Sequence, residues 1–183
     1  SIDDIKTRFP KYEDYYCVYP NIIENGELLI SIEDNKYDFL IANHMIEHTE
    51  NVFKTIQNHL RVLKKGGILY YAVPDKRFTF DKNRELTTYE HLKAEYLYGS
   101  ENYRYEHFLD FVTNVQNVKE EKEASKVAKK LSEEGLDTHF HVWTSETFID
   151  HIKKAIEDKI LNIEILEHTH KNDIESITIL KKL

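Results

Sequence analysis

The sequence predicts an α/β fold built around a strand–helix–strand crossover. Residues 37–42 form an apolar run bounded by polar residues, which is typical of a strand buried on both faces of a parallel sheet. Apolar residues then follow helical spacing over 52–63, and residues 68–73 form a second apolar strand that Pro74 closes. Elements of this order and length favour two parallel strands joined by a right-handed crossover.

Boundary residues support the helix between these strands. Thr49 is suited to cap its first turn, and Lys64, Lys65 and Gly66 would form a cationic last turn with a glycine C-cap. The strand at 37–42 is expected to be central in the sheet, because it is apolar throughout.

The sequence before the crossover predicts only short elements. Ser1 and Asp4 have the form of a capping box, which predicts a short helix that ends at Pro10. Residues 21–24 predict a short strand, and residues 25–27 predict a loop.

A long insertion follows the second strand, which ends at Val73. Residues 75–137 are rich in Tyr, Phe, His and charged side chains, and an insertion of this length usually has a function. A capping box at 87–90 predicts a helix that Gly99 ends, and residues 119–134 predict a charged surface helix.

The chain then returns to the sheet. His139, His141 and Trp143 occupy every second position of residues 138–143. If this segment is extended, these three side chains share one face. Ser145 is expected to cap a helix, and residues 161–167 and 174–180 predict a C-terminal β-hairpin.

Composition limits the classes of protein that this chain can represent. The 183 residues, 40% hydrophobic and 32% charged, describe a single soluble domain. The net charge of -8 disfavours nucleic acid, and no apolar run approaches the roughly 20 residues that cross a membrane. A lone Cys17 and the absence of a leader indicate the cytoplasm. The five glycines form no glycine-rich nucleotide-binding motif.

Residues 37–81 carry several features that occur together in one known family. The segment, YDFLIANHMIEHTENVFKTIQNHLRVLKKGGILYYAVPDKRFTFD, contains a strand, an N-H-x-x-E-H loop, a helix followed by Gly-Gly, and a second strand. It resembles the second half of a class I S-adenosylmethionine-dependent methyltransferase, with Lys65 where the family usually has proline. The resemblance implies a Rossmann-like sheet and methyl transfer to a small polar acceptor, with a saccharide as one expected class.

The resemblance also implies which residues meet the cofactor, S-adenosylmethionine. Asn25, Gly26 and Glu27 would lie beside the adenine, and Asn43 and His44 would face the methionine part at the carboxyl end of a strand.

The first strand and the glycine-rich loop of the family have no counterpart here. Their absence would leave the strand at 37–42 with an unpaired edge, which should aggregate or recruit a partner. We therefore expect that Ser1 is not the natural start. A truncated gene product, or a homodimer or partner subunit that completes the sheet, would explain the same feature.

Two histidines are candidates for catalysis on the acceptor side. His139 or His141 is expected to act as a general base toward an acceptor hydroxyl. An alternative interpretation gives this pair a metal ion together with Asp75 or Asp137, and a structural role is a further alternative. We expect no bound metal.

Other polar residues are candidates for binding the acceptor. Asp75, Arg77 and His107 lie in the insertion, which the resemblance identifies as the segment that covers the acceptor. Arg77 is suited to a bidentate contact with an anion, although an ion pair with Asp81 or Glu85 is the simpler expectation.

Two other functions are weighed against methyl transfer. Residues 44–48 read H-x-x-E-H, a signature in which two helical histidines bind zinc and a glutamate activates water. A degenerate fold that only binds a partner is the other alternative, and the missing glycine-rich motif favours it.

Overall fold

The computed structural model describes residues 20–171 and 174–183, and it contains a four-stranded mixed sheet in the order β1-β2-β4-β3. β1 (Tyr37–Asn43) is parallel to β2 (Leu63–Pro74). β4 (Glu175–Lys182) is antiparallel to both β2 and β3 (Ile163–Lys171). The predicted α/β crossover and C-terminal hairpin are confirmed, and the helix predicted from Ser1 to Pro10 lies outside the described residues.

α2 (Val52–Val62) connects the two parallel strands, but its ends differ from those predicted. Asn51 is the N-cap, because its side chain accepts a hydrogen bond from the Lys54 amide, while the Thr49 hydroxyl donates to a carbonyl in the preceding turn. The helix ends at Val62, since Leu63 already pairs with β1, so the predicted cap at Gly66 is wrong.

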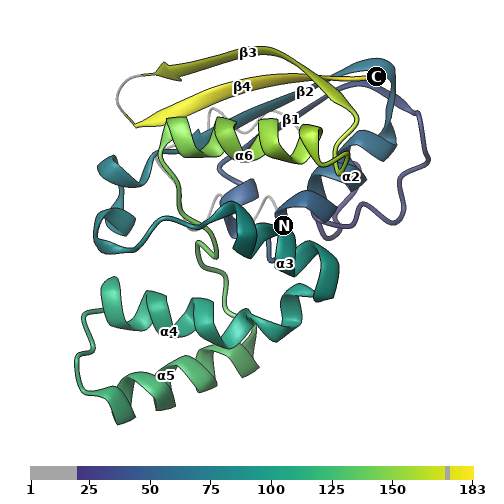
Figure 1. The fold of residues 1–183 in the computed structure, drawn as a ribbon. Helices are drawn as coiled ribbons and strands as arrows, with labels where there is room; N and C mark the ends of the chain where they lie inside the picture. The colour runs from purple at the N-terminus through teal and green to yellow at the C-terminus, as the bar shows by residue number, and fades with distance from the viewer. Residues whose placement is uncertain (1–19, 172–173) are drawn as a thin grey trace, which may run out of the picture.

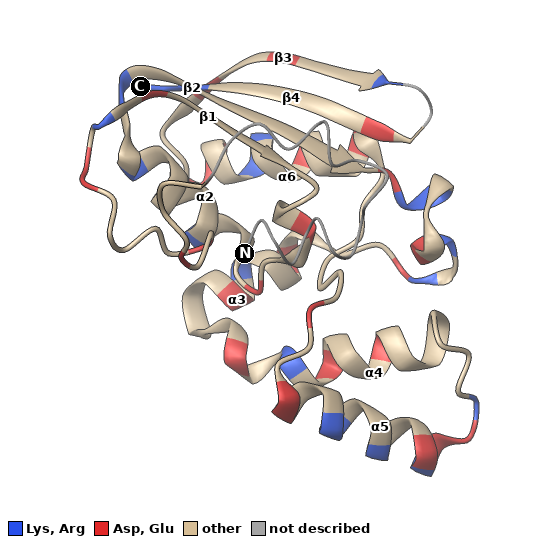
Figure 2. Cartoon of the chain, turned by 180° about the vertical axis from the view of Figure 1, so that it is seen from behind, with Lys and Arg blue, Asp and Glu red and all other residues tan. Residues whose placement is uncertain are grey.

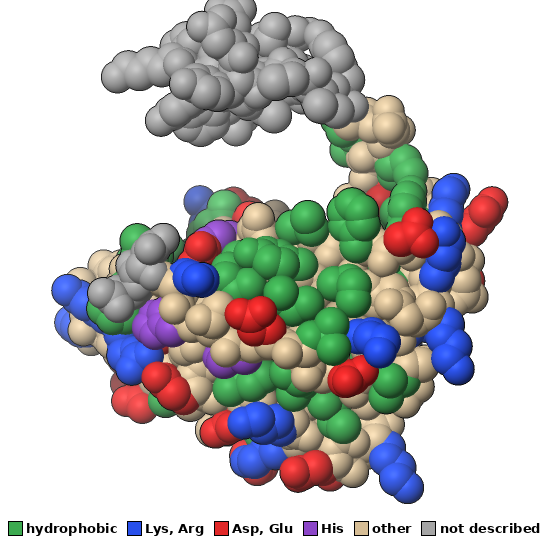
Figure 3. Space-filling model, turned by 90° about the horizontal axis from the view of Figure 1, so that it is seen from above, with side chains coloured by type: hydrophobic (Ala, Val, Ile, Leu, Met, Phe, Trp, Pro, Cys, Tyr) green, Lys and Arg blue, Asp and Glu red, His purple; other side chains and the backbone are tan. Residues whose placement is uncertain are grey.

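Helices cover one face of the sheet in the described part of the chain. In Figure 1, α2 and α6 (Ser145–Glu157) lie below the strands, and the main hydrophobic core fills the space between. The opposite face carries a group of hydrophobic side chains, seen from above in Figure 3. Phe39 and Ile41 of β1 are 65% and 58% exposed, whereas Leu40 and Ala42 pack against the core.

β1 is an edge strand among the described residues, so the expectation that it is central and buried on both faces is wrong for them. β2 is its partner on one side, and none of the described strands pairs with the other side. The strand predicted at 21–24 is also absent from the structure. The Glu24 carboxylate instead accepts bonds from the amide and hydroxyl of Ser31, which folds this segment into a loop.

The predicted helical insertion is present between β2 and α6. It contains α3 (Tyr89–Tyr98), α4 (Arg104–Asn114) and α5 (Glu121–Glu134). α4 and α5 form a hairpin away from the sheet with a small core of its own, and Lys, Arg, Asp and Glu line α5 in Figure 2. Gly99, at a φ of 94°, ends α3 as predicted.

Residues 138–143 form a connection without helix or strand, between the α4–α5 hairpin and α6. The amides of Phe140 and His141 both donate to the Glu47 carbonyl, which fixes this connection beside the loop after β1. Thr144, rather than the predicted Ser145, caps α6 through a reciprocal pair of bonds with Thr147. None of the helices in the described ranges has the length and apolar character needed to cross a membrane.

Candidate active site

His139 and Asp81 form a hydrogen-bonded pair at the end of the sheet where β1 and β2 finish. Nδ1 of His139 lies 2.6 Å from Oδ2 of Asp81, and Arg84 donates to the other carboxylate oxygen at 2.9 Å. Burial acts to raise the pKa of Asp81, but the bonds from His139 and Arg84 outweigh it and hold the pKa below its ordinary value. The ionised carboxylate favours the tautomer with the proton on Nδ1, which leaves Nε2 of His139 as an acceptor.

A second carboxylate, that of Glu47, lies close to this pair. A carboxylate oxygen of Glu47 and one ring nitrogen each of His48 and His139 lie within 4.8 Å of one another. Glu47 is 1% exposed, and its two carboxylate oxygens have no hydrogen-bond partner among the described residues. Burial raises the pKa of Glu47. The nearest histidine nitrogens, of His44 and His48, are 3.6 and 3.9 Å from the Glu47 carboxylate. A buried carboxyl group without a hydrogen bond is unusual in a folded protein and is typical of a functional site.

Replacing Glu47 by Gln is expected to raise the free energy of unfolding, and more at pH 8 than at pH 5. Because burial raises the pKa of Glu47, the folded state binds more protons than the unfolded state above the ordinary Glu pKa. The stability of the unmodified protein therefore falls as the pH rises through the raised pKa, and Gln removes this loss. The expected gain at pH 8 is about 1–2 kcal/mol.

Urea unfolding at the two pH values measures this difference. The matched control is Glu133→Gln, on the exposed side of α5, which should change stability by less than about 0.5 kcal/mol. Equal effects of the two substitutions at pH 8 would contradict the assignment of Glu47 as a buried carboxyl group without a hydrogen-bond partner.

His141 belongs to a different group of side chains, which we call the Glu95 cluster and which consists of His91, Glu95, His107 and His141. Nε2 of His141 lies 2.8 Å from one oxygen of Glu95. Burial lowers the pKa of His141 to about 4, so its ring is neutral at pH 7. The structure thus separates the imidazole rings of His139 and His141, because the first bonds to Asp81 and the second to Glu95.

The five residues expected at the cofactor also separate. Gly26 and Asn43 line one cavity of about 370 Å³ beside β1. The Asn25 side chain instead accepts the amide of Glu27 and closes a turn, while Glu27 lines a different cavity, where burial raises its pKa. His44 adopts a positive φ of 49° and places its Nε2 2.8 Å from Glu175.

His59 also lines the cavity beside β1, and it was not recognised from the sequence. Its Nε2 donates to the Gly26 carbonyl at 2.9 Å, and its Nδ1 accepts the Tyr71 hydroxyl at 2.7 Å. Burial lowers the pKa of His59, so it is neutral and suited to this pairing. His59 therefore holds the loop around Gly26 against the helix.

The three residues expected to bind the acceptor do not converge. Asp75 is buried and accepts from Arg77 and from the Ser145 amide, so it fixes the start of α6. Arg77 pairs with Asp75 and Glu146 rather than with Asp81 or Glu85, because Asp75 lies only two residues before it. The third residue, His107, belongs to the Glu95 cluster.

The H-x-x-E-H segment lacks the geometry of a zinc hydrolase. His44 follows the end of β1, and a three-residue 3₁₀ turn covers Ile46–His48, so the two histidines do not share one helical face. Asp137 pairs with His48 at 2.7 Å and Asp75 pairs with Arg77, so neither acid joins His139 or His141 as the alternative metal set requires.

Several solved structures are similar to this chain. A S-adenosylmethionine-dependent methyltransferase from Methanosarcina mazei has a TM-score of 0.46 and 20% identity, and the match covers 88% of this chain and 66% of that protein. A putative methyltransferase from Listeria monocytogenes has a TM-score of 0.49 and 12% identity, and the match covers 96% of this chain and 76% of that protein. The trans-methyltransferase CalH, solved with S-adenosylhomocysteine, has a TM-score of 0.45 and 13% identity, and the match covers 100% of this chain and 40% of that protein.

This chain therefore spans just under two thirds of the Methanosarcina protein and less than half of CalH. No curated protein sequence matches it significantly. A family model described as a methyltransferase domain matches residues 5–155, which is most of the sequence. The chain accordingly belongs to the methyltransferase domain family.

Proposed function

We propose that this chain takes part in methyl transfer from S-adenosylmethionine to a hydroxyl group of a small polar acceptor, and that His139 accepts the proton of that hydroxyl. The observation that carries the proposal is the hydrogen bond between His139 and Asp81 at the carboxyl ends of β1 and β2. Ligands of open α/β sheets bind at this end of the strands. A saccharide is the acceptor class that we favour, on the resemblance of residues 37–81 to the methyltransferase family.

The residues beside β1 fit part of the cofactor. The cavity offers the Asn43 amide, an apolar wall that includes Leu29 and Met45, and the backbone at Gly26. Its lining contains no carboxylate among the described residues that would bind the ribose hydroxyls. The described residues therefore do not hold the whole cofactor by themselves.

The outer edge of β1 supports the inference that a further strand completes this cavity. Its outer backbone groups lack a strand partner in the described chain, and an open strand edge is suited to pair with a further strand. The additional strand belongs either to another part of the same polypeptide or to a second subunit.

The proposed role of His139 follows from its contacts. S-adenosylmethionine, when bound, supplies an electrophilic methyl group, and an attacking hydroxyl has to lose its proton. Asp81 holds the Nδ1 proton, so Nε2 of His139 is left to accept that proton. The rings of His48 and Phe80, with centroids 4.6 Å from that of His139, restrict its orientation.

Measuring S-adenosylhomocysteine formation from S-adenosylmethionine and a panel of hexoses tests this role. His139→Asn is expected to lower the rate at least about 100-fold, as the loss of a general base does. The control His170→Asn changes an exposed histidine of β3 and should leave the rate unchanged. An active His139→Asn variant with the full rate would contradict the role proposed for His139.

A further inference from the structure

The Glu95 cluster brings four potential metal ligands together from three separate segments. His91 and Glu95 are one turn apart on α3, His107 comes from α4, and His141 comes from the connection at 138–143. One nitrogen or oxygen atom of each side chain lies within 4.8 Å of the others. Three imidazoles and one carboxylate thus point at one place in the protein interior.

The distances in this cluster resemble those between ligands of one metal ion. Nε2 of His91 and Nε2 of His107 are 3.2 Å apart, and they lie 3.0 and 2.7 Å from the same oxygen of Glu95. Ligands at about 2.1 Å from a common ion, at angles between about 90° and 110°, are about 3.0–3.4 Å apart. The distances of 3.2 and 3.0 Å fall in this range, and the 2.7 Å contact of His107 would have to lengthen when an ion binds. We propose that the Glu95 cluster binds one divalent transition-metal ion, contrary to the expectation from the sequence that no metal is bound.

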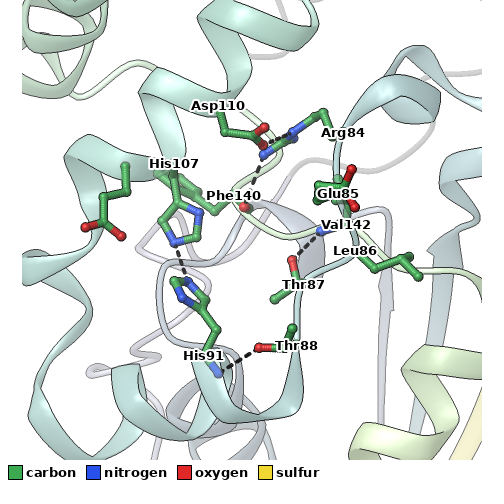
Figure 4. Close-up of a pocket in the computed structure, with 11 residues that line it drawn as sticks. Arg84, Glu85, Leu86, Thr87, Thr88, His91, His107, Asp110, Phe140 and Val142 are labelled. Carbon is green, nitrogen blue, oxygen red and sulfur yellow. Dashed lines mark hydrogen bonds and ion pairs between the residues drawn. The ribbon is translucent and has the colours of Figure 1, made fainter.

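The cluster is connected to the surface by a cavity, so an ion has a route of entry. A cavity of about 240 Å³ is lined by His91 and His107 and also by Arg84, Thr87 and Asp110. Figure 4 shows the rings of His91 and His107 facing each other at one side of this cavity. Two of the four ligands border this space, and a water molecule or an oxygen of a small ligand can therefore take a remaining coordination position.

The ligand set narrows the class of metal. Imidazole nitrogens together with a carboxylate suit zinc, iron, cobalt or manganese, whereas magnesium and calcium prefer oxygen ligands alone. Zn²⁺ binds nitrogen and oxygen ligands more tightly than Mn²⁺ or Fe²⁺ does, so Zn²⁺ is an adequate probe even if another ion is used naturally. A bound ion would join α3, α4 and residues 138–143, and so fix the insertion relative to the sheet.

Calorimetric titration of the untagged, chelator-stripped chain with Zn²⁺ tests the site without any methyl donor, so its result is independent of the proposed function. One ion is expected to bind, with a dissociation constant below about 1 µM. His91→Ala, on the accessible side of the cluster, is expected to weaken binding at least 100-fold. His170→Ala is the matched control and should bind Zn²⁺ as the unmodified chain does.

His48→Ala separates this site from the group formed by Glu47, His48 and His139, and it should also leave Zn²⁺ affinity unchanged. Circular dichroism shows that each variant is folded, and Zn²⁺ should raise the melting temperature of the unmodified chain but not that of His91→Ala. The proposal is overturned if the folded chain binds no Zn²⁺ at 100 µM. It is also overturned if His48→Ala abolishes binding while His91→Ala does not.

Discussion

Replacing Arg84 by Met is expected to lower the free energy of unfolding by about 3–5 kcal/mol, the usual cost of removing one partner of a buried ion pair. The guanidinium of Arg84 is 1% exposed and donates to Asp81 and Asp110 at 2.9 and 2.6 Å. It also donates to the carbonyls of His139 and Phe140. Met fills much of the same volume, so the loss measures buried charge and hydrogen bonds rather than a cavity.

Urea unfolding followed by circular dichroism measures this effect. The control Lys181→Met breaks an exposed ion pair with Glu164, and it should cost less than about 1 kcal/mol. If Arg84→Met costs no more than this control, the bonds of Arg84 do not hold the insertion to residues 139–140.

Replacing Trp143 by Ala is expected to cost a similar amount, about 3–5 kcal/mol, because it empties a large volume in the main core. Trp143 is 1% exposed and lies between the ring of His141, stacked at a centroid distance of 6.1 Å, and the ring of Phe148 at 5.0 Å. It therefore connects the sheet core to the Glu95 cluster.

Two controls separate packing from other effects of this substitution. Trp143→Phe keeps an aromatic ring at the same place and should lose clearly less stability than Trp143→Ala. Leu97→Ala removes a side chain that is 55% exposed on α3, and it should change the free energy by less than about 0.5 kcal/mol. A cost of Trp143→Ala as small as that of Leu97→Ala would show that this region is not a packed core.

The elements predicted correctly are those whose signals are local. The apolar run of β2, the alternation in β3 and β4 and the glycine after α3 each reflect contacts within a few residues. The prediction that β1 is buried on both faces was wrong because it, too, used only local sequence. Phe39 and Ile41 are as apolar as a strand buried on both faces requires, but the described residues cover only one of those faces.

The site could be predicted only in part, because its contacts join distant segments. His139 was selected from the sequence, but Asp81 is 58 residues away, and no local pattern indicates that they pair. The sequence spacing of His91 and Glu95 predicts that they are neighbours on one helix face. Their contacts with His107 and His141 depend instead on how α4 and residues 138–143 pack against this helix. The burial of Glu47 without a hydrogen-bond partner likewise depends on how distant segments pack around it.

The most direct test of the methyltransferase assignment for this chain is calorimetric titration with S-adenosylhomocysteine. Since the described residues fit only part of this ligand, we predict a dissociation constant of about 10–100 µM. Asn43→Ala should weaken binding at least tenfold, while Asn83→Ala, which changes an exposed asparagine in the insertion, should have no effect. No binding at about 1 mM ligand by the folded chain would contradict a cofactor site at β1 and favour a non-catalytic binding module.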